Sequence, residues 1–151
     1  MHRLVQEPWS AVVLVALVTH LKLFTLAAIQ GVTRVTQRRF VKPEDAAFFG
    51  RGAPPASEEH PRVLLAQRAI DNEIQNLPTF GLALVAYAAL RGSGAFALGV
   101  ACVFLLARCA HSGFYVQPTQ PHRNRVYVIG QLATFTLLVA LVLHLFAVAG
   151  R

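Results

Sequence analysis

The chain has 151 residues, of which 55% are hydrophobic and only 14% are charged. A soluble domain of this length would carry more charge, so the composition excludes an ordinary soluble protein and favours an integral membrane protein. The formal net charge is +7, but the basic residues lie between apolar runs rather than on one soluble face, so we expect no nucleic-acid partner.

Four apolar segments predict an all-α integral membrane protein, a bundle of four transmembrane helices forming a single domain over residues 1–151. The first helix is expected over about residues 9–39, with Trp9 as an interfacial anchor. His20 and Lys22 fall near its middle, so they should face the bundle interior unless the lysine snorkels. A cytoplasmic loop over about 40–62 follows, in which Pro43 and the two acids after it indicate the start of a short helix.

The other three helices are expected over about residues 63–90, 95–116 and 124–148. The third of the four ends in a polar stretch in which four side chains share one helical face, at spacings i, i+3, i+4 and i+7. Such a stripe indicates either a binding site or a snorkelling arginine with structural packing. The four residues are Arg108, His111, Ser112 and Tyr115.

The distribution of lysine and arginine predicts the orientation of the helices. The connections over 31–62 and 117–125 carry six and two of these residues, whereas the two termini and the short connection after the second helix carry one each. By the positive-inside rule, both basic connections lie in the cytoplasm and both termini lie outside. The polar half of every helix then meets on the cytoplasmic side, in a bacterial inner membrane or the endoplasmic reticulum.

The converging side chains are rich in hydrogen-bond donors and poor in carboxylates. This chemistry fits an anionic ligand, such as a small dicarboxylate or a lipid phosphate. We expect no metal site, because His111 has no second ligand at a suitable spacing and two cysteines give no metal signature. A channel or transporter is disfavoured because the sequence shows neither a broken helix nor a charged pore ring.

Four motifs in order resemble the MAPEG family, the membrane-associated proteins in eicosanoid and glutathione metabolism. Residues 38–45 (RRFVKPED) resemble the family's basic loop, and residues 67–78 (QRAIDNEIQNLP) resemble its second-helix signature. Arg108-x-x-His111-x-x-x-Tyr115 matches the third-helix motif, and Pro121-x-Arg123-x-x-x-Tyr127 matches the start of the fourth helix. The resemblance covers roughly residues 30–135.

The resemblance implies a homotrimer with one glutathione in each cleft between neighbours, and a glutathione-dependent transferase or peroxidase acting on lipophilic electrophiles or lipid hydroperoxides. Arg123 would stabilise the glutathione thiolate, with Asp45 orienting that arginine or relaying a proton and Asn124 acting as a weaker donor. The residues that would bind glutathione are Arg34, Arg38, Arg68, Asn72, Gln75, Arg108, His111, Tyr115, Arg123 and Tyr127.

Several departures from the family pattern bear on the activity. Gln75 stands where the family usually has a glutamate, and Asn124 replaces the serine of the prostaglandin E synthases. Ile70 and Asp71 replace a histidine and, in those synthases, an arginine. Glu73 is two positions from Gln75 and is expected to point elsewhere, so it does not restore the missing charge. These departures argue against prostaglandin synthesis. They also leave an alternative, a non-catalytic member of the family that binds lipid or serves as a scaffold in the membrane.

Overall fold

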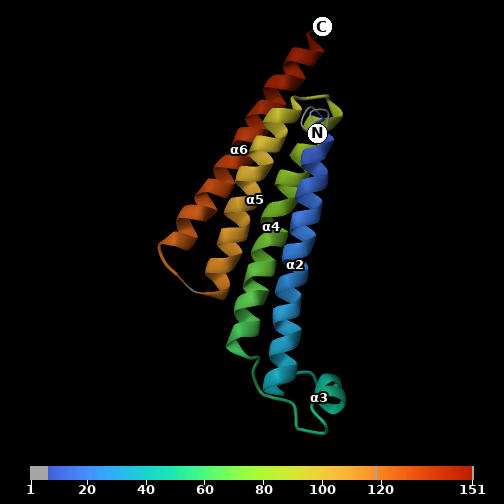
Figure 1. Ribbon diagram of the computed structural model, residues 1–151, viewed down its shortest axis with the longest axis vertical. Helices are drawn as coiled ribbons and strands as arrows, with labels where there is room; N and C mark the ends of the chain where they lie inside the picture. Colours follow the sequence, from blue (N-terminus) through green and yellow to red (C-terminus); the bar gives the residue numbers. More distant parts are fainter. Residues whose placement is uncertain (1–6, 118, 151) are drawn as a thin grey trace.

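The computed structural model describes residues 7–117 and 119–150, and this part of the chain contains helices and no strand. The all-α prediction is therefore confirmed. Four long helices run side by side and one short helix, α3, lies in the connection between the first two (Figure 1). The beginning of α2 and the end of α6 lie at one end of the bundle, and α3 lies at the other (Figure 1). Their bounds are α2 Trp9–Gln37, α3 Pro43–Phe49, α4 Pro61–Ala89, α5 Gly94–Val116 and α6 His122–Ala149.

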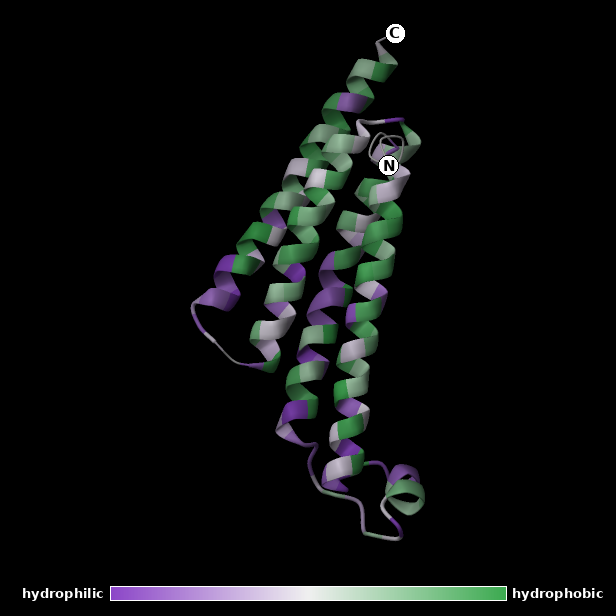
Figure 2. Ribbon diagram, viewed as in Figure 1, coloured by the Kyte–Doolittle hydropathy of each residue, from purple (hydrophilic) through white to green (hydrophobic). Residues whose placement is uncertain are grey.

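Three of the long helices, α2, α5 and α6, are long and apolar enough to cross a membrane. Their outward faces carry large apolar side chains, including Phe24, Leu106 and Phe135, each of which is well over half exposed. Lipid is the solvent that such a surface needs. The fourth long helix, α4, does not meet the same measure, because its first half is polar (Figure 2). The expectation of four apolar spans is thus met in three of the four long helices.

The helix ends follow from local chemistry. The first helix stops at Gln37, two residues before the expected end, because Arg38 takes a left-handed conformation with φ of 48° and its N–H bonds back to the carbonyls of the last turn. Pro61 starts α4, and His60 caps it by accepting a hydrogen bond from the Arg62 amide at 3.1 Å. The expected short helix is present as α3, with Pro43 in its first turn.

An apolar core fills the half of the bundle nearest the chain ends. Alanines on all four long helices are buried there, which lets the backbones approach closely. Phe80 of α4 and Phe104 of α5 stack face to face with ring centroids 3.8 Å apart. A second, smaller cluster of Leu26, Ala66 and Ala69 joins α2 and α4 nearer α3. Between these two clusters along the helices lies a buried polar layer, and it positions the candidate site.

Only one of the two polar residues near the middle of α2 faces this layer. The Lys22 side chain is 9% exposed and points into the bundle, as expected. His20 is exposed on the outer surface of the chain, so the expectation that it faces the interior is wrong for the single subunit. The two residues differ because a separation of two positions places them on different faces of a helix.

Candidate functional site

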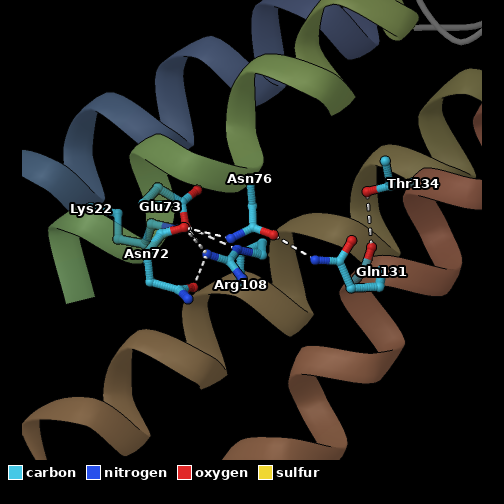
Figure 3. Close-up of polar contacts among 8 residues, drawn as sticks. Lys22, Asn72, Glu73, Asn76, Arg108, Gln131 and Thr134 are labelled. Atoms are coloured by element: carbon cyan, nitrogen blue, oxygen red, sulfur yellow. Dashed lines mark hydrogen bonds and ion pairs between the residues drawn. The ribbon is translucent and has the colours of Figure 1, made fainter. Parts of the chain in front are cut away.

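A buried ion network crosses three helices at the level of Lys22 (Figure 3). The Lys22 Nζ lies 2.8 Å from Oε2 of Glu73, and the same oxygen accepts from Nε of Arg108 at 3.0 Å. The side chains of Glu73 and Arg108 are almost completely buried, at 0% and 2% exposure. The network therefore ties α2, α4 and α5 together through one carboxylate.

The network contains two cations and one anion. Isolated charges at membrane depth are costly, so each cation depends on Glu73 for compensation. The second carboxylate oxygen of Glu73, Oε1, has no hydrogen-bond partner among the described residues. Both cations are therefore paired with the same oxygen of Glu73, Oε2.

Arg108 extends the polar layer from Glu73 to Asn72. Its Nη2 donates to Oδ1 of Asn72 at 2.6 Å and to the backbone carbonyl of Asn72 at 3.0 Å. The layer then reaches α6, because Gln131 Nε2 donates to Oδ1 of Asn76 at 2.5 Å (Figure 3). Asn76 thus forms a hydrogen bond between α4 and α6, whereas Asn72 lines a pocket.

A pocket of about 520 Å³ lies next to this layer, where α4, α5 and the start of α6 meet. Six of the residues expected to bind or activate glutathione line it together, although they come from three separate helices. Two further residues, Gln120 and Pro121 of the connection before α6, complete the wall. The six expected residues are Asn72, His111, Tyr115, Arg123, Asn124 and Tyr127.

Arg123 is held in this pocket by an aromatic ring and an amide. Its guanidinium carbon lies over the Tyr115 ring, 4.7 Å from the centroid. When the Gln120 amide is oriented with its oxygen toward the guanidinium, that oxygen accepts from Nε at 3.2 Å and from Nη2 at 2.6 Å. The described residues that line the pocket include no carboxylate, so the arginine charge is not neutralised there.

The imidazole of His111 lies between two phenol rings. Its centroid is 5.1 Å from that of Tyr115, in an edge-to-face contact, and 5.6 Å from that of Tyr127. These contacts place two hydroxyl groups and an imidazole on one wall of the pocket, beside Arg123. The pocket therefore combines one cation with several neutral donors, a composition that suits an anionic, polar ligand.

The other expected site residues lie outside this pocket in the single chain. Arg34 donates from Nε and Nη2 to Oε2 of Glu59, at 2.9 and 2.7 Å. Although partial burial alone would raise the pKa of Glu59, the hydrogen bonds from Arg34 and from the His60 amide hold that pKa below its ordinary value. Asp45 lies on α3, on a different element from Arg123. Arg38, directly after α2, and Arg68 and Gln75 on α4 are exposed.

A larger groove, of about 710 Å³, runs between α2 and α5. Apolar side chains such as Leu21, Leu26 and Phe114 form most of it. Among its polar lining residues, Thr25 and Gln117 are exposed, whereas Nζ of Lys22 and Oγ of Ser112 are buried. This groove is suited to apolar chains, and the polar chemistry of the molecule is concentrated in the smaller pocket.

Two features of the site were not predicted from the sequence. Glu73 was expected only to point away from the face of Gln75, and its pairing with Lys22 and Arg108 in the polar layer was not predicted. The sequence could have predicted this pairing, because a carboxylate in a membrane helix needs a cation at the same depth. Lys22 and Arg108 are two such cations. Gln120 carried no signal, because its contact with Arg123 depends on the path of the connection between α5 and α6.

Comparison with known proteins gives a consistent result. The model of the MAPEG family matches residues 12–143. Microsomal glutathione S-transferase 1 of Mus musculus is 28% identical over 120 residues, which cover 77% of this chain and 77% of that protein. Prostaglandin E synthase of Homo sapiens is 29% identical over 113 residues, covering 74% of this chain and 73% of that protein.

Proposed function

The chain belongs to the MAPEG family, and we propose that it is a glutathione-dependent membrane transferase or peroxidase acting on lipophilic electrophiles or lipid hydroperoxides. Relatives named glutathione transferase and prostaglandin E synthase support a glutathione-dependent enzyme in general. The observation that carries the proposal is Arg123, a cation without a carboxylate neighbour among the described lining residues of its pocket.

The lining of the pocket fits glutathione by its chemistry. Glutathione carries two carboxylates, which match guanidinium, phenol, imidazole and amide donors. Asn72 and His111 supply neutral donors on the side of α4 and α5, and Tyr115 and Tyr127 supply hydroxyl groups. Arg123 is the one lysine or arginine among the described residues that line the pocket, so it is suited to the thiol or to a carboxylate.

The proposed role of Arg123 is to favour the thiolate. A free thiol titrates near pH 8.5, and a fixed cation nearby makes the reactive, deprotonated form more abundant at neutral pH. In transfer, the sulfur forms a bond to the electrophilic carbon and the leaving group departs with the electron pair. In peroxide reduction, two thiols are oxidised to one disulfide while the O–O bond is cleaved to an alcohol and water. Asn124 lines the pocket and is proposed as an additional donor.

We propose that the functional unit is a homotrimer in which neighbouring copies complete each cleft. Arg68, Asp71 and Gln75 form an exposed polar face on α4, and such a face is costly against lipid. A neighbouring copy would cover it, and α4 would then serve as the fourth span inside the assembly. Arg34, Arg38 and Asp45 would reach the cleft of the neighbour rather than that of their own chain. The cleft is proposed to open to the cytoplasm.

A second candidate, a lipid-binding or scaffold protein, is favoured by the apolar groove between α2 and α5. That groove is larger than the polar pocket. It offers room for an acyl chain without requiring any chemistry. The scaffold reading predicts that lipid is retained through purification while glutathione has no effect.

Turnover separates the two candidates. Detergent-solubilised protein is assayed with chlorodinitrobenzene and with a lipid hydroperoxide, in the presence and absence of glutathione. The enzyme proposal predicts conversion of at least one substrate only when glutathione is present. No conversion of either, with lipid specifically retained, would favour the scaffold.

A further inference from the structure

Asn72 belongs both to the buried polar layer and to the wall of the pocket. It shares the layer with Arg108 through a 2.6 Å hydrogen bond and lines the pocket together with Arg123. The side-chain amide of Asn72 therefore connects the buried charges of the bundle with the wall of the pocket. Which end of that amide faces the pocket decides what the pocket can recognise.

The chemistry of Arg108 fixes the orientation of this amide. A guanidinium carries only N–H donors, so the atom of Asn72 that faces it must be the acceptor Oδ1. The amino group of Asn72, which is a donor, is then the end left for the pocket. With Arg108 in place, Asn72 presents donors to a ligand.

Glu73 in turn fixes Arg108. Its Oε2 lies 3.0 Å from both Nε and Nη2 of the guanidinium, and both side chains are buried. One of these two nitrogens, Nη2, also donates to Asn72. Movement of the guanidinium away from Glu73 would therefore also remove the constraint on the amide.

From this geometry we infer that Glu73 is a positioning residue that acts through Arg108 and Asn72 to make the pocket select a ligand with a carboxylate at this point. The inference rests on the proposed function only for the identity of the ligand, glutathione. It predicts selectivity for the free acid over an ester, because an ester oxygen is a weaker acceptor without negative charge. Glu73 does not touch the ligand.

The test measures calorimetric binding of glutathione and of its dialkyl ester to the solubilised protein. The wild type is expected to bind the free acid at least tenfold more tightly than the ester. Asn72→Asp keeps an acceptor toward Arg108 but replaces the pocket-facing donor with an anion, so this preference should disappear. Glu73→Gln should weaken binding of the free acid about tenfold, whereas the same substitution at the exposed Glu58 should leave the dissociation constant unchanged.

Calorimetry separates positioning from simple folding, because stoichiometry reports the folded fraction and the dissociation constant reports the site. A Glu73→Gln protein with lowered stoichiometry and an unchanged dissociation constant would overturn the inference while leaving the proposed function intact. So would an Asn72→Asp protein that retains the preference for the free acid.

If the wild type does not bind glutathione, the proposed function is wrong. The inference can then still be tested by a measurement that needs no ligand. The geometry predicts that Asn72→Asp unfolds at a temperature no lower than wild type, because the new carboxylate faces Arg108 and balances the extra cation. Asn72→Leu should unfold at a lower temperature. A lower midpoint for Asn72→Asp than for Asn72→Leu would overturn the assigned orientation of the amide.

Discussion

The guanidinium of Arg108 and the carboxylate of Glu73 face each other between α5 and α4, with Nε and Oε2 3.0 Å apart and both side chains buried. This pair separates Arg108 from the polar stripe to which it belongs on α5. His111 and Tyr115 line the pocket, whereas Arg108 points into the bundle and supports the pocket from behind. The four residues of the stripe therefore divide into Arg108, which supports the pocket, His111 and Tyr115, which line it, and Ser112, which lines the groove between α2 and α5.

The three charges of the polar layer should contribute unequally to stability. Glu73→Leu leaves two buried cations without compensation, so we expect a loss of about 3–5 kcal/mol in the free energy of unfolding. Lys22→Met leaves Arg108 and Glu73 as a balanced pair, so the change should stay within about 1 kcal/mol. Unfolding in mixed micelles, followed by circular dichroism, measures both. Equal losses for the two variants would contradict the assignment of Glu73 as the shared anion.

Removal of the Arg123 charge should affect chemistry more than binding. We expect Arg123→Gln to lower kcat by about 10²–10³-fold, the range found when a group that stabilises developing negative charge is removed. The dissociation constant for glutathione should rise much less. Arg125→Gln is the matched control, because Arg125 is exposed and is not among the lining residues. A similar fall in kcat for both variants would show that general positive charge, not the site, is responsible.

The ion pair between Arg34 and Glu59 gives a pH dependence with a defined sign. Because the pKa of Glu59 is lowered in the folded protein, the pair stabilises the protein above the ordinary glutamate pKa, and this contribution is lost as the pH falls through the lowered pKa. The pair is partly exposed, so its contribution should stay within about 1 kcal/mol.

The measurement is the thermal midpoint of the wild type minus that of Glu59→Gln, recorded from neutral to acidic pH. The difference should be positive at neutral pH and approach zero in acid. A difference that grows with acidification would contradict the account.

The turn between α4 and α5 should tolerate no side chain at its glycine. A Cβ at Gly92 would overlap the ring of Tyr87. That ring is buried, and its hydroxyl accepts a hydrogen bond from the Ser93 amide at 3.2 Å, so it cannot move freely. Gly92→Ala should therefore lower the unfolding midpoint by several degrees. Gly99→Ala is the control, because its Cβ meets nothing within 4 Å and alanine favours helix, so the midpoint should hold or rise.

Much of the fold follows from patterns that are local in the sequence. Long apolar runs, Pro43 and Pro61 at helix starts, and glycine and serine in the turn after α4 place the helices close to their observed bounds. The expected end of α2 and the expected starts of α4 and α6 each differ from the structure by two residues. The end of α2 depends on the left-handed conformation of Arg38, which propensity does not specify.

Part of the candidate site could be predicted from the sequence because of the geometry of a helix. Side chains at spacings of three and four share a helical face, so the pocket residues of α5 and α6 could be grouped from sequence alone. Contacts between helices are different, because they depend on rotation and depth of each helix in the bundle. For that reason the pairing of Glu73 with Lys22 and Arg108, and the packing of Arg123 on Tyr115, became visible only in the structure.

Calorimetric titration of glutathione into the detergent-solubilised wild-type protein tests directly whether this pocket binds glutathione. We expect saturable binding that is weakened by salt, because an uncompensated arginine and several donors recognise an anion. Absence of saturable binding under conditions in which the protein is folded would contradict the claim that this pocket is a glutathione site.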